Sequence, residues 1–110
     1  MGMIEKQSKF ASMAARLIQK ALEMGYQVSL GEAWRSDFEA ARMMAERKGV
    51  RRSLHCERLA LDLNLFRGGV WLSRSEDHRP LGEWWESIGG AWGGRFGDGN
   101  HYSLEHEGRN

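Results

Sequence analysis

The first part of the chain has the hydrophobic spacing of an amphipathic helix. Across residues 4–24, apolar side chains recur three and four positions apart, at Phe10, Met13, Ala14, Leu17, Ile18, Ala21 and Leu22. Gly25 follows, and glycine is the commonest residue just beyond a helix end because it adopts the left-handed conformation without strain. We therefore expect one helix over this range, with its apolar stripe packed in the core.

A strictly alternating segment in the middle of the chain predicts a half-buried strand. Over residues 59–66, every second residue from Leu59 is a leucine, and the residues between them are Ala60, Asp62 and Asn64. Successive side chains of a strand point to opposite faces of the sheet. The leucines should therefore face the core, and Asp62 should point away from it.

Two further elements are expected between these segments. Residues 26–34 favour a strand, with Val28 and Leu30 on one side. Ser36 or Asp37 would then cap a second helix over residues 37–47, which stops at Gly49.

The last third of the chain predicts a hairpin, a helix and a final strand. Residues 67–69 form an Arg-Gly-Gly turn into residues 70–72, which is typical of a β-hairpin. A short helix should follow Pro80 over residues 81–88, and the glycine-rich residues 89–99 should form a loop that passes close to a functional site. A short strand is expected over residues 101–104. Helices that precede mostly antiparallel strands indicate an α+β domain, with the N-terminal helices packed on the sheet.

Size and composition are those of one folded domain spanning residues 1–110. The hydrophobic share of 41% is well above that of a disordered chain. With 16 basic and 15 acidic residues the net charge is only +1, so no overall field favours nucleic acid or an anionic membrane. One local basic cluster is either a solvated loop or a feature suited to an anionic substrate; it comprises Arg47, Lys48, Arg51 and Arg52.

Neither a disulfide nor an export signal is expected. Cys56 is the only cysteine, so no internal disulfide can form. Charged residues such as Glu5, Lys9 and Arg16 interrupt the first twenty residues, which therefore form neither a signal peptide nor a membrane span. We expect no stable membrane insertion.

Three residues could together hold a metal ion. A hydrolytic zinc site takes three protein ligands from His, Asp, Glu or Cys and leaves a fourth position for water. His55 precedes the leucine-rich strand, Asp62 lies on its polar face, and His101 opens the last strand, which could pair alongside. The His-x6-Asp spacing is loose by itself, because a lone histidine is more often a surface or packed polar residue.

A fourth residue, Asp98, could act as a general base. It stands three positions before His101, from where its carboxylate could reach a water on the metal without binding the metal itself. The alternative is a simple Asp-Gly turn, which both residues favour for backbone reasons. The local pattern leaves both interpretations open.

Two blocks of residues carry a family resemblance. The first is Ser-Leu-His at 53–55 followed by LALDLNLF at 59–66, and the second is WGGRF at 92–96 followed by DGNHY at 98–102. Together they resemble the M15 family of zinc peptidases. The likeness is greatest to small phage and prophage members, which include L-alanyl-D-glutamate endopeptidases and relatives of D-alanyl-D-alanine carboxypeptidases. It extends from about Leu30 to Ser103.

The resemblance implies a role for each candidate residue. His55, Asp62 and His101 fall at the positions of the family's ligands to one zinc ion. Asp98 falls at the position of its catalytic acidic residue.

Two residues would contact substrate by the same resemblance. Arg35, within Trp34-Arg35-Ser36, would face a substrate carboxylate or the developing oxyanion, to which a planar guanidinium is suited. Ser53 would help to bind substrate. Trp34 replaces the more usual tyrosine, and Tyr102 stands where phenylalanine is common.

Other candidate ligands are rejected on spacing. Cys56 neighbours His55, and adjacent residues rarely bind one tetrahedral ion well, so a packed thiol is expected. His78 and His106 have no acidic or cysteine partner at a useful spacing and are expected to be solvent-exposed.

The sequence therefore favours a zinc metallopeptidase that hydrolyses peptidoglycan stem peptides, with the L-Ala–D-Glu bond as the leading substrate. The alternatives are a D-Ala-D-Ala carboxypeptidase of the same family and a non-catalytic, zinc-containing cell-wall-binding module. Structural zinc sites usually have four protein ligands, whereas three and a free carboxylate favour an enzyme. We also expect a monomeric, endolysin-like protein that remains in the host cytoplasm until its release to the periplasm and cell wall.

Overall fold

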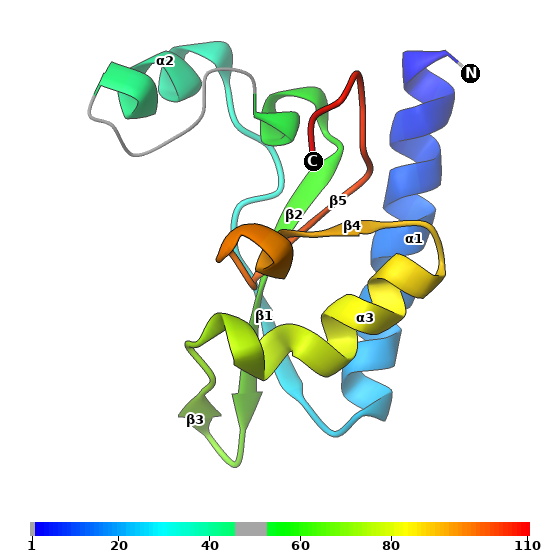
Figure 1. The fold of residues 1–110 in the computed structure, drawn as a ribbon, viewed down its shortest axis with the longest axis vertical. Coiled ribbons are helices and arrows are strands. Elements are labelled where there is room, and N and C mark those ends of the chain that lie inside the picture. The colour runs from blue at the N-terminus through cyan, green and yellow to red at the C-terminus, as the bar shows by residue number, and fades with distance from the viewer. Residues whose placement is uncertain (1, 46–52) are drawn as a thin grey trace.

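The chain folds as an α+β domain, in which the described residues form three helices and an antiparallel sheet (Figure 1). The computed structural model describes residues 2–45 and 53–110. Its helices are α1 (Met3–Glu23), α2 (Asp37–Ala45) and α3 (Arg79–Ser87). Its strands are β1 (Gln27–Leu30), β2 (Ala60–Arg67), β3 (Val70–Trp71), β4 (Ala91–Trp92) and β5 (His101–Ser103). Three 3-10 turns are η1 (Leu54–Glu57), η2 (Ser75–His78) and η3 (Gly93–Phe96).

Strand β2 organises the sheet. The strand order is β1-β2-β5-β4, and β3 also pairs with β2 as the second strand of the predicted hairpin. Every one of these pairings is antiparallel. In the β2–β5 ladder, Asp62 lies directly opposite His101.

The core lies where α1 and α3 cover the sheet (Figure 1). The predicted leucine face of β2 is confirmed, because each leucine from Leu59 to Leu65 is buried. Each fully buried leucine contributes roughly 1.5–3 kcal/mol to stability, so this face anchors the strand. The predicted stripe of α1 is also confirmed at its buried residues Phe10, Met13, Leu17 and Ala21, although Leu22 is exposed.

The segment after α1 forms a shorter strand than predicted. β1 ends at Leu30, which is exposed at the edge of the sheet, rather than at residue 34. Two main-chain hydrogen bonds continue the contact with β2: Gly31 N–H donates to the Asp62 carbonyl, and Asp62 N–H donates to the Glu32 carbonyl, both at 2.8 Å. The chain then leaves the sheet beside the residues of the candidate site.

Helix α2 begins where the sequence predicted. The Ser36 hydroxyl accepts a hydrogen bond from Glu39 N–H, which confirms Ser36 as the cap. The predicted end of this helix, together with the stop at Gly49, lies outside the described residues. The basic cluster of Arg47, Lys48, Arg51 and Arg52 lies outside them as well.

The prediction of one continuous loop over residues 89–99 is wrong. They contain β4 and the 3-10 turn η3. The buried indole of Trp92 explains the order of this segment, since its N–H donates to the Gly99 carbonyl at 2.7 Å. Gly82 and Gly94 both approach that ring so closely that a Cβ at either position would overlap it.

Helix α3 forms near the predicted range but begins earlier, at Arg79, with Pro80 in its first turn. Proline is tolerated there because its missing N–H would have no partner within the helix. No helix within residues 2–45 and 53–110 is long and apolar enough to cross a membrane.

The prediction that His78 is solvent-exposed is wrong. Its side chain is almost completely buried, with 3% exposure, and its Nδ1 lies 2.8 Å from the hydroxyl of Tyr102 on β5. Burial lowers the pKa of His78 to about 4, against a smaller opposing effect of Asp77. The imidazole is therefore neutral in the folded protein at neutral pH.

This burial predicts a loss of stability in mild acid. The unfolded chain binds a proton at His78 below about pH 6.5, whereas the folded chain resists it until about pH 4. The contribution of His78 to the free energy of unfolding is therefore fully present above pH 6.5. About 3 kcal/mol of it is lost as the pH falls from 6.5 to 4. Urea denaturation at pH 7 and pH 4.5 should show this fall in unfolding free energy in the wild type and a smaller fall in His78→Gln. An equal fall in both proteins would contradict the prediction that the buried, neutral His78 causes it.

Candidate metal centre

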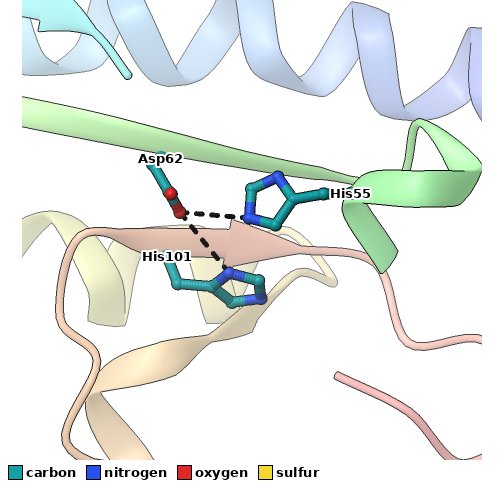
Figure 2. A group of neighbouring side chains, drawn as sticks. All are labelled: His55, Asp62 and His101. Carbon is teal, nitrogen blue, oxygen red and sulfur yellow. Dashed lines mark ion pairs between the residues drawn. The ribbon is translucent and has the colours of Figure 1, made fainter. Parts of the chain in front are cut away.

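Three side chains from separate segments converge at one point (Figure 2). His55, Asp62 and His101 each place one potential ligand atom within 4.8 Å of the others. Asp62 Oδ1 lies 3.2 Å from His55 Nε2 and 3.6 Å from His101 Nδ1. Both imidazole rings are thus turned toward one carboxylate oxygen.

The turn η1 fixes His55. Ser53 caps this turn, and its Oγ accepts a hydrogen bond from His55 N–H at 3.1 Å. The neighbouring Leu54 is buried in the core, and Arg58 ends the turn in the left-handed conformation. The imidazole of His55 is itself buried and meets that of His101 edge to face, with 5.2 Å between ring centroids.

Close main-chain packing holds His101 and Asp98 in place. A Cβ at Gly93 would come within 2.2 Å of the Asp98 carbonyl oxygen and 2.7 Å of His101 Cβ. Only glycine leaves room for this approach, so at Gly93 the glycine-rich segment does pass close to the site. His101 N–H also donates to the Asp98 carbonyl at 3.1 Å.

The electrostatics of the site favour a cation. Burial opposes ionisation of Asp62, but the imidazoles of His101 and His55 outweigh it and hold the pKa of Asp62 at about 2. Asp62 Oδ1 and His55 Nδ1 are nevertheless buried without a hydrogen-bond partner among the described residues. A carboxylate oxygen left unsatisfied between two imidazole nitrogens fits a divalent metal ion, and zinc binds this combination of nitrogen and oxygen donors.

Asp98 lies at the edge of the group rather than within it. Its Oδ2 is 4.0 Å from His101 Nδ1, and its side chain is 53% exposed. It borders a cleft of about 180 Å³ that Arg74 and Asn100 also line. Burial and the nearby Asp62 raise the pKa of Asp98, and His101 partly opposes this shift. A carboxylate in this position is accessible to water and substrate without being one of the three converging groups.

Arg35 reaches the site through a partner that the sequence reasoning missed. Its side-chain Nε and Nη2 contact Glu32 Oε1 at 2.7 and 2.6 Å, and its main-chain N–H donates to the His55 carbonyl at 3.1 Å. Glu32 Oε1 also lies 3.7 Å from His55 Nδ1. The three-residue spacing of Glu32 and Arg35 could have suggested their pairing, but nothing in the sequence connects Glu32 with His55.

The remaining candidates lie outside the metal group. Cys56 is a half-buried free thiol. The prediction that His106 is solvent-exposed is wrong, because its side chain is mostly buried, with its two ring nitrogens near Lys6 and Glu57. Lys6 lies on α1 and Glu57 in η1, so segments that are distant from His106 in the sequence cover its side chain.

Among solved structures, the crystal structure of the L-Ala D-Glu endopeptidase ChiX of Serratia marcescens has the same fold, with a TM-score of 0.68 and 22% sequence identity. The match covers 83% of this chain and 77% of that one. No curated protein sequence matches the chain significantly.

A family model settles the relationship. The M15 peptidase model described as D-alanyl-D-alanine carboxypeptidase matches residues 46–104, more than half of the chain. The chain therefore belongs to the M15 peptidase family, which confirms the resemblance inferred from the two sequence blocks.

The geometry predicts one metal ion per chain. His55→Ala, Asp62→Ala and His101→Ala should each abolish stoichiometric zinc binding, because each removes one of three converging donors. Zinc should also raise the melting temperature of the wild type, since it binds the folded state. Elemental analysis after dialysis checks this, with His106→Ala as a matched histidine control that should retain zinc. Full zinc content in all three site variants would refute the assignment.

Proposed function

We propose that this M15 peptidase is a zinc enzyme that cleaves a peptide bond in the stem peptides of bacterial peptidoglycan, with the L-Ala–D-Glu bond as its leading substrate. The observation that carries the proposal is the open His55–Asp62–His101 group with the accessible Asp98 at its edge. The similar fold of an L-Ala D-Glu endopeptidase supports this choice of bond. The description of the matching family model supports the alternative, a D-Ala-D-Ala carboxypeptidase.

The donor set supports catalysis rather than a purely structural metal. Structural zinc sites are usually closed by four protein ligands, whereas the group found within residues 2–45 and 53–110 offers three and would leave a coordination position open. A zinc ion held by His55, Asp62 and His101 would supply Lewis acidity at the scissile carbonyl and would acidify a water molecule. A non-catalytic cell-wall-binding module would need no such open position.

Asp98 is the proposed general base. Its carboxylate would take a proton from the attacking water and later deliver that proton to the departing amine. Its raised pKa suits both tasks, because a carboxyl group with a higher pKa is a stronger base and exchanges its proton closer to neutral pH. Its partial exposure leaves the carboxylate accessible to both water and substrate.

Arg35 and Ser53 are the proposed substrate contacts. Two of the five guanidinium N–H groups of Arg35 face Glu32, which leaves others for a substrate carboxylate or the developing oxyanion. The Ser53 hydroxyl accepts from His55 N–H and keeps its own hydrogen to donate to substrate. Both residues would thus orient the peptide while also supporting His55.

The setting in which the enzyme acts is part of the proposal. We propose a monomer that remains in the cytoplasm of the host and acts on the cell wall after release. This setting rests on the resemblance to phage and prophage members of the family. The expected partner is the stem peptide, without nucleic acid.

Asp98→Asn tests the mechanism separately from metal binding. The amide nearly matches the carboxylate in shape, so zinc content and melting temperature should remain close to wild type. Hydrolysis of purified peptidoglycan should fall by about 10²–10⁴-fold, the usual share of acid–base catalysis. Mass analysis of the released fragments on the same samples identifies the bond that is cut.

The possible outcomes separate three roles for Asp98. If Asp98 were a fourth zinc ligand, activity and zinc content would fall together. If it were only a turn residue, turnover would survive, and retained zinc with wild-type turnover would refute the proposed base.

Arg35→Lys tests the substrate contact. A single ammonium retains the charge but cannot reproduce the planar fork. Loss of one charge-assisted hydrogen bond should lower kcat/KM by about 10–100-fold while the zinc is retained. Arg95→Lys, in a surface pair with Glu86, is the control and should leave the kinetics unchanged. Unchanged kinetics in Arg35→Lys would remove Arg35 from the site.

A further inference from the structure

Glu32 is held next to the metal group by its own main chain. The Glu32 carbonyl accepts a hydrogen bond from Asp62 N–H, and the preceding Gly31 N–H donates to the Asp62 carbonyl, both at 2.8 Å. A Cβ at Gly31 would lie 3.0 Å from Asp62 Cβ, so the two segments are packed at the limit of close contact. The position of Glu32 is therefore fixed by the same strand that carries Asp62.

The side chain of Glu32 joins Arg35 to His55. Its Oε1 contacts Nε and Nη2 of Arg35 at 2.7 and 2.6 Å and lies 3.7 Å from His55 Nδ1. The guanidinium of Arg35 is buried, with 9% exposure, so it neutralises the carboxylate and limits its rotation. Glu32 is thus the charged group that faces the side of His55 opposite Asp62.

His55 Nδ1 requires such a partner. It is buried and has no hydrogen-bond partner among the described residues, and leaving a buried polar atom unpaired costs roughly 1–3 kcal/mol. Because Nε2 faces Asp62, the Nδ1 atom is the ring nitrogen that must carry the proton when Nε2 binds a metal ion. In metal sites, this second N–H of a ligating histidine almost always donates to a carboxylate, a carbonyl or water.

We propose that Glu32 is a positioning residue of the metal centre: its carboxylate, held by Arg35, accepts the Nδ1 proton of His55 and so turns Nε2 toward the metal. The inference rests on the proposed function for the presence of the metal. The separation of 3.7 Å is longer than a hydrogen bond, so the proposal requires the Glu32 carboxylate and the His55 ring to move closer together when the metal is bound. Arg35 accordingly acts on the metal site through Glu32 as well as on substrate.

Glu32→Gln tests this role, with Glu86→Gln as a matched control. Each glutamate pairs with an arginine, and their exposed fractions are 31% and 30%, but Glu86 lies on α3 away from the histidines. Zinc dissociation constants of the full chain, from competition with a chelator, should be about 10–100-fold weaker in Glu32→Gln and unchanged in Glu86→Gln. A purely structural role for Glu32 would lower the melting temperature of the metal-free protein and leave its zinc affinity unchanged. That result would overturn the proposal.

A measurement on the wild type keeps the proposal testable if Glu32→Gln fails to fold. Nitrogen-15 NMR of the zinc-loaded protein should show a protonated Nδ1 and a metal-bound Nε2 for His55. The reverse assignment would overturn the role of Glu32.

Failure of this inference can be told apart from failure of the proposed function. Zinc binding by the wild type without peptidoglycan hydrolysis would refute the proposed function alone. Wild-type zinc affinity in Glu32→Gln would refute the role of Glu32 alone. Absence of zinc binding by the wild type would overturn both.

Discussion

The antiparallel pairing of β2 with β5 is the contact on which the candidate site depends. It places Asp62 directly opposite His101, and residues that face each other across such a ladder project from the same side of the sheet. The leucines of β2 are buried on the other side. A slip of one residue would turn Asp62 into the core and the leucines into the site, so the hydrophobic core fixes the register that the site requires. Burial of the β2 leucines therefore both stabilises the fold and sets the geometry of the candidate site.

The charges around the site suit the binding of a divalent cation. Asp62 is ionised despite its burial, and Asp98 adds a second carboxyl group at the edge. Glu32 would add a third negative charge, but the buried Arg35 balances it. Two imidazoles and one ionised carboxylate at the centre suit a metal ion, and the Arg35–Glu32 pair limits the excess of negative charge around them.

Close main-chain packing supplies the rest of the geometry. Gly31 allows the strand edge to reach Asp62, and Gly93 allows η3 to pack against Asp98 and His101. The buried indole of Trp92 anchors that second segment through its bond to the Gly99 carbonyl. The side chains of the site are thus positioned by contacts between backbones, which are stiffer than contacts between exposed side chains.

The sequence by itself determined the elements whose signals are local. The period of two in β2 and the spacing of three and four in α1 are properties of adjacent residues, so both elements and their buried faces were predictable. The motif resemblance was enough to name His55, Asp62 and His101. Tertiary structure alone decided which other distant groups meet. His78, in η2, is buried against Tyr102 on β5, and Glu32 faces His55 because Gly31 packs on Asp62. Such contacts depend on how the elements pack together, and no local period or spacing records that packing.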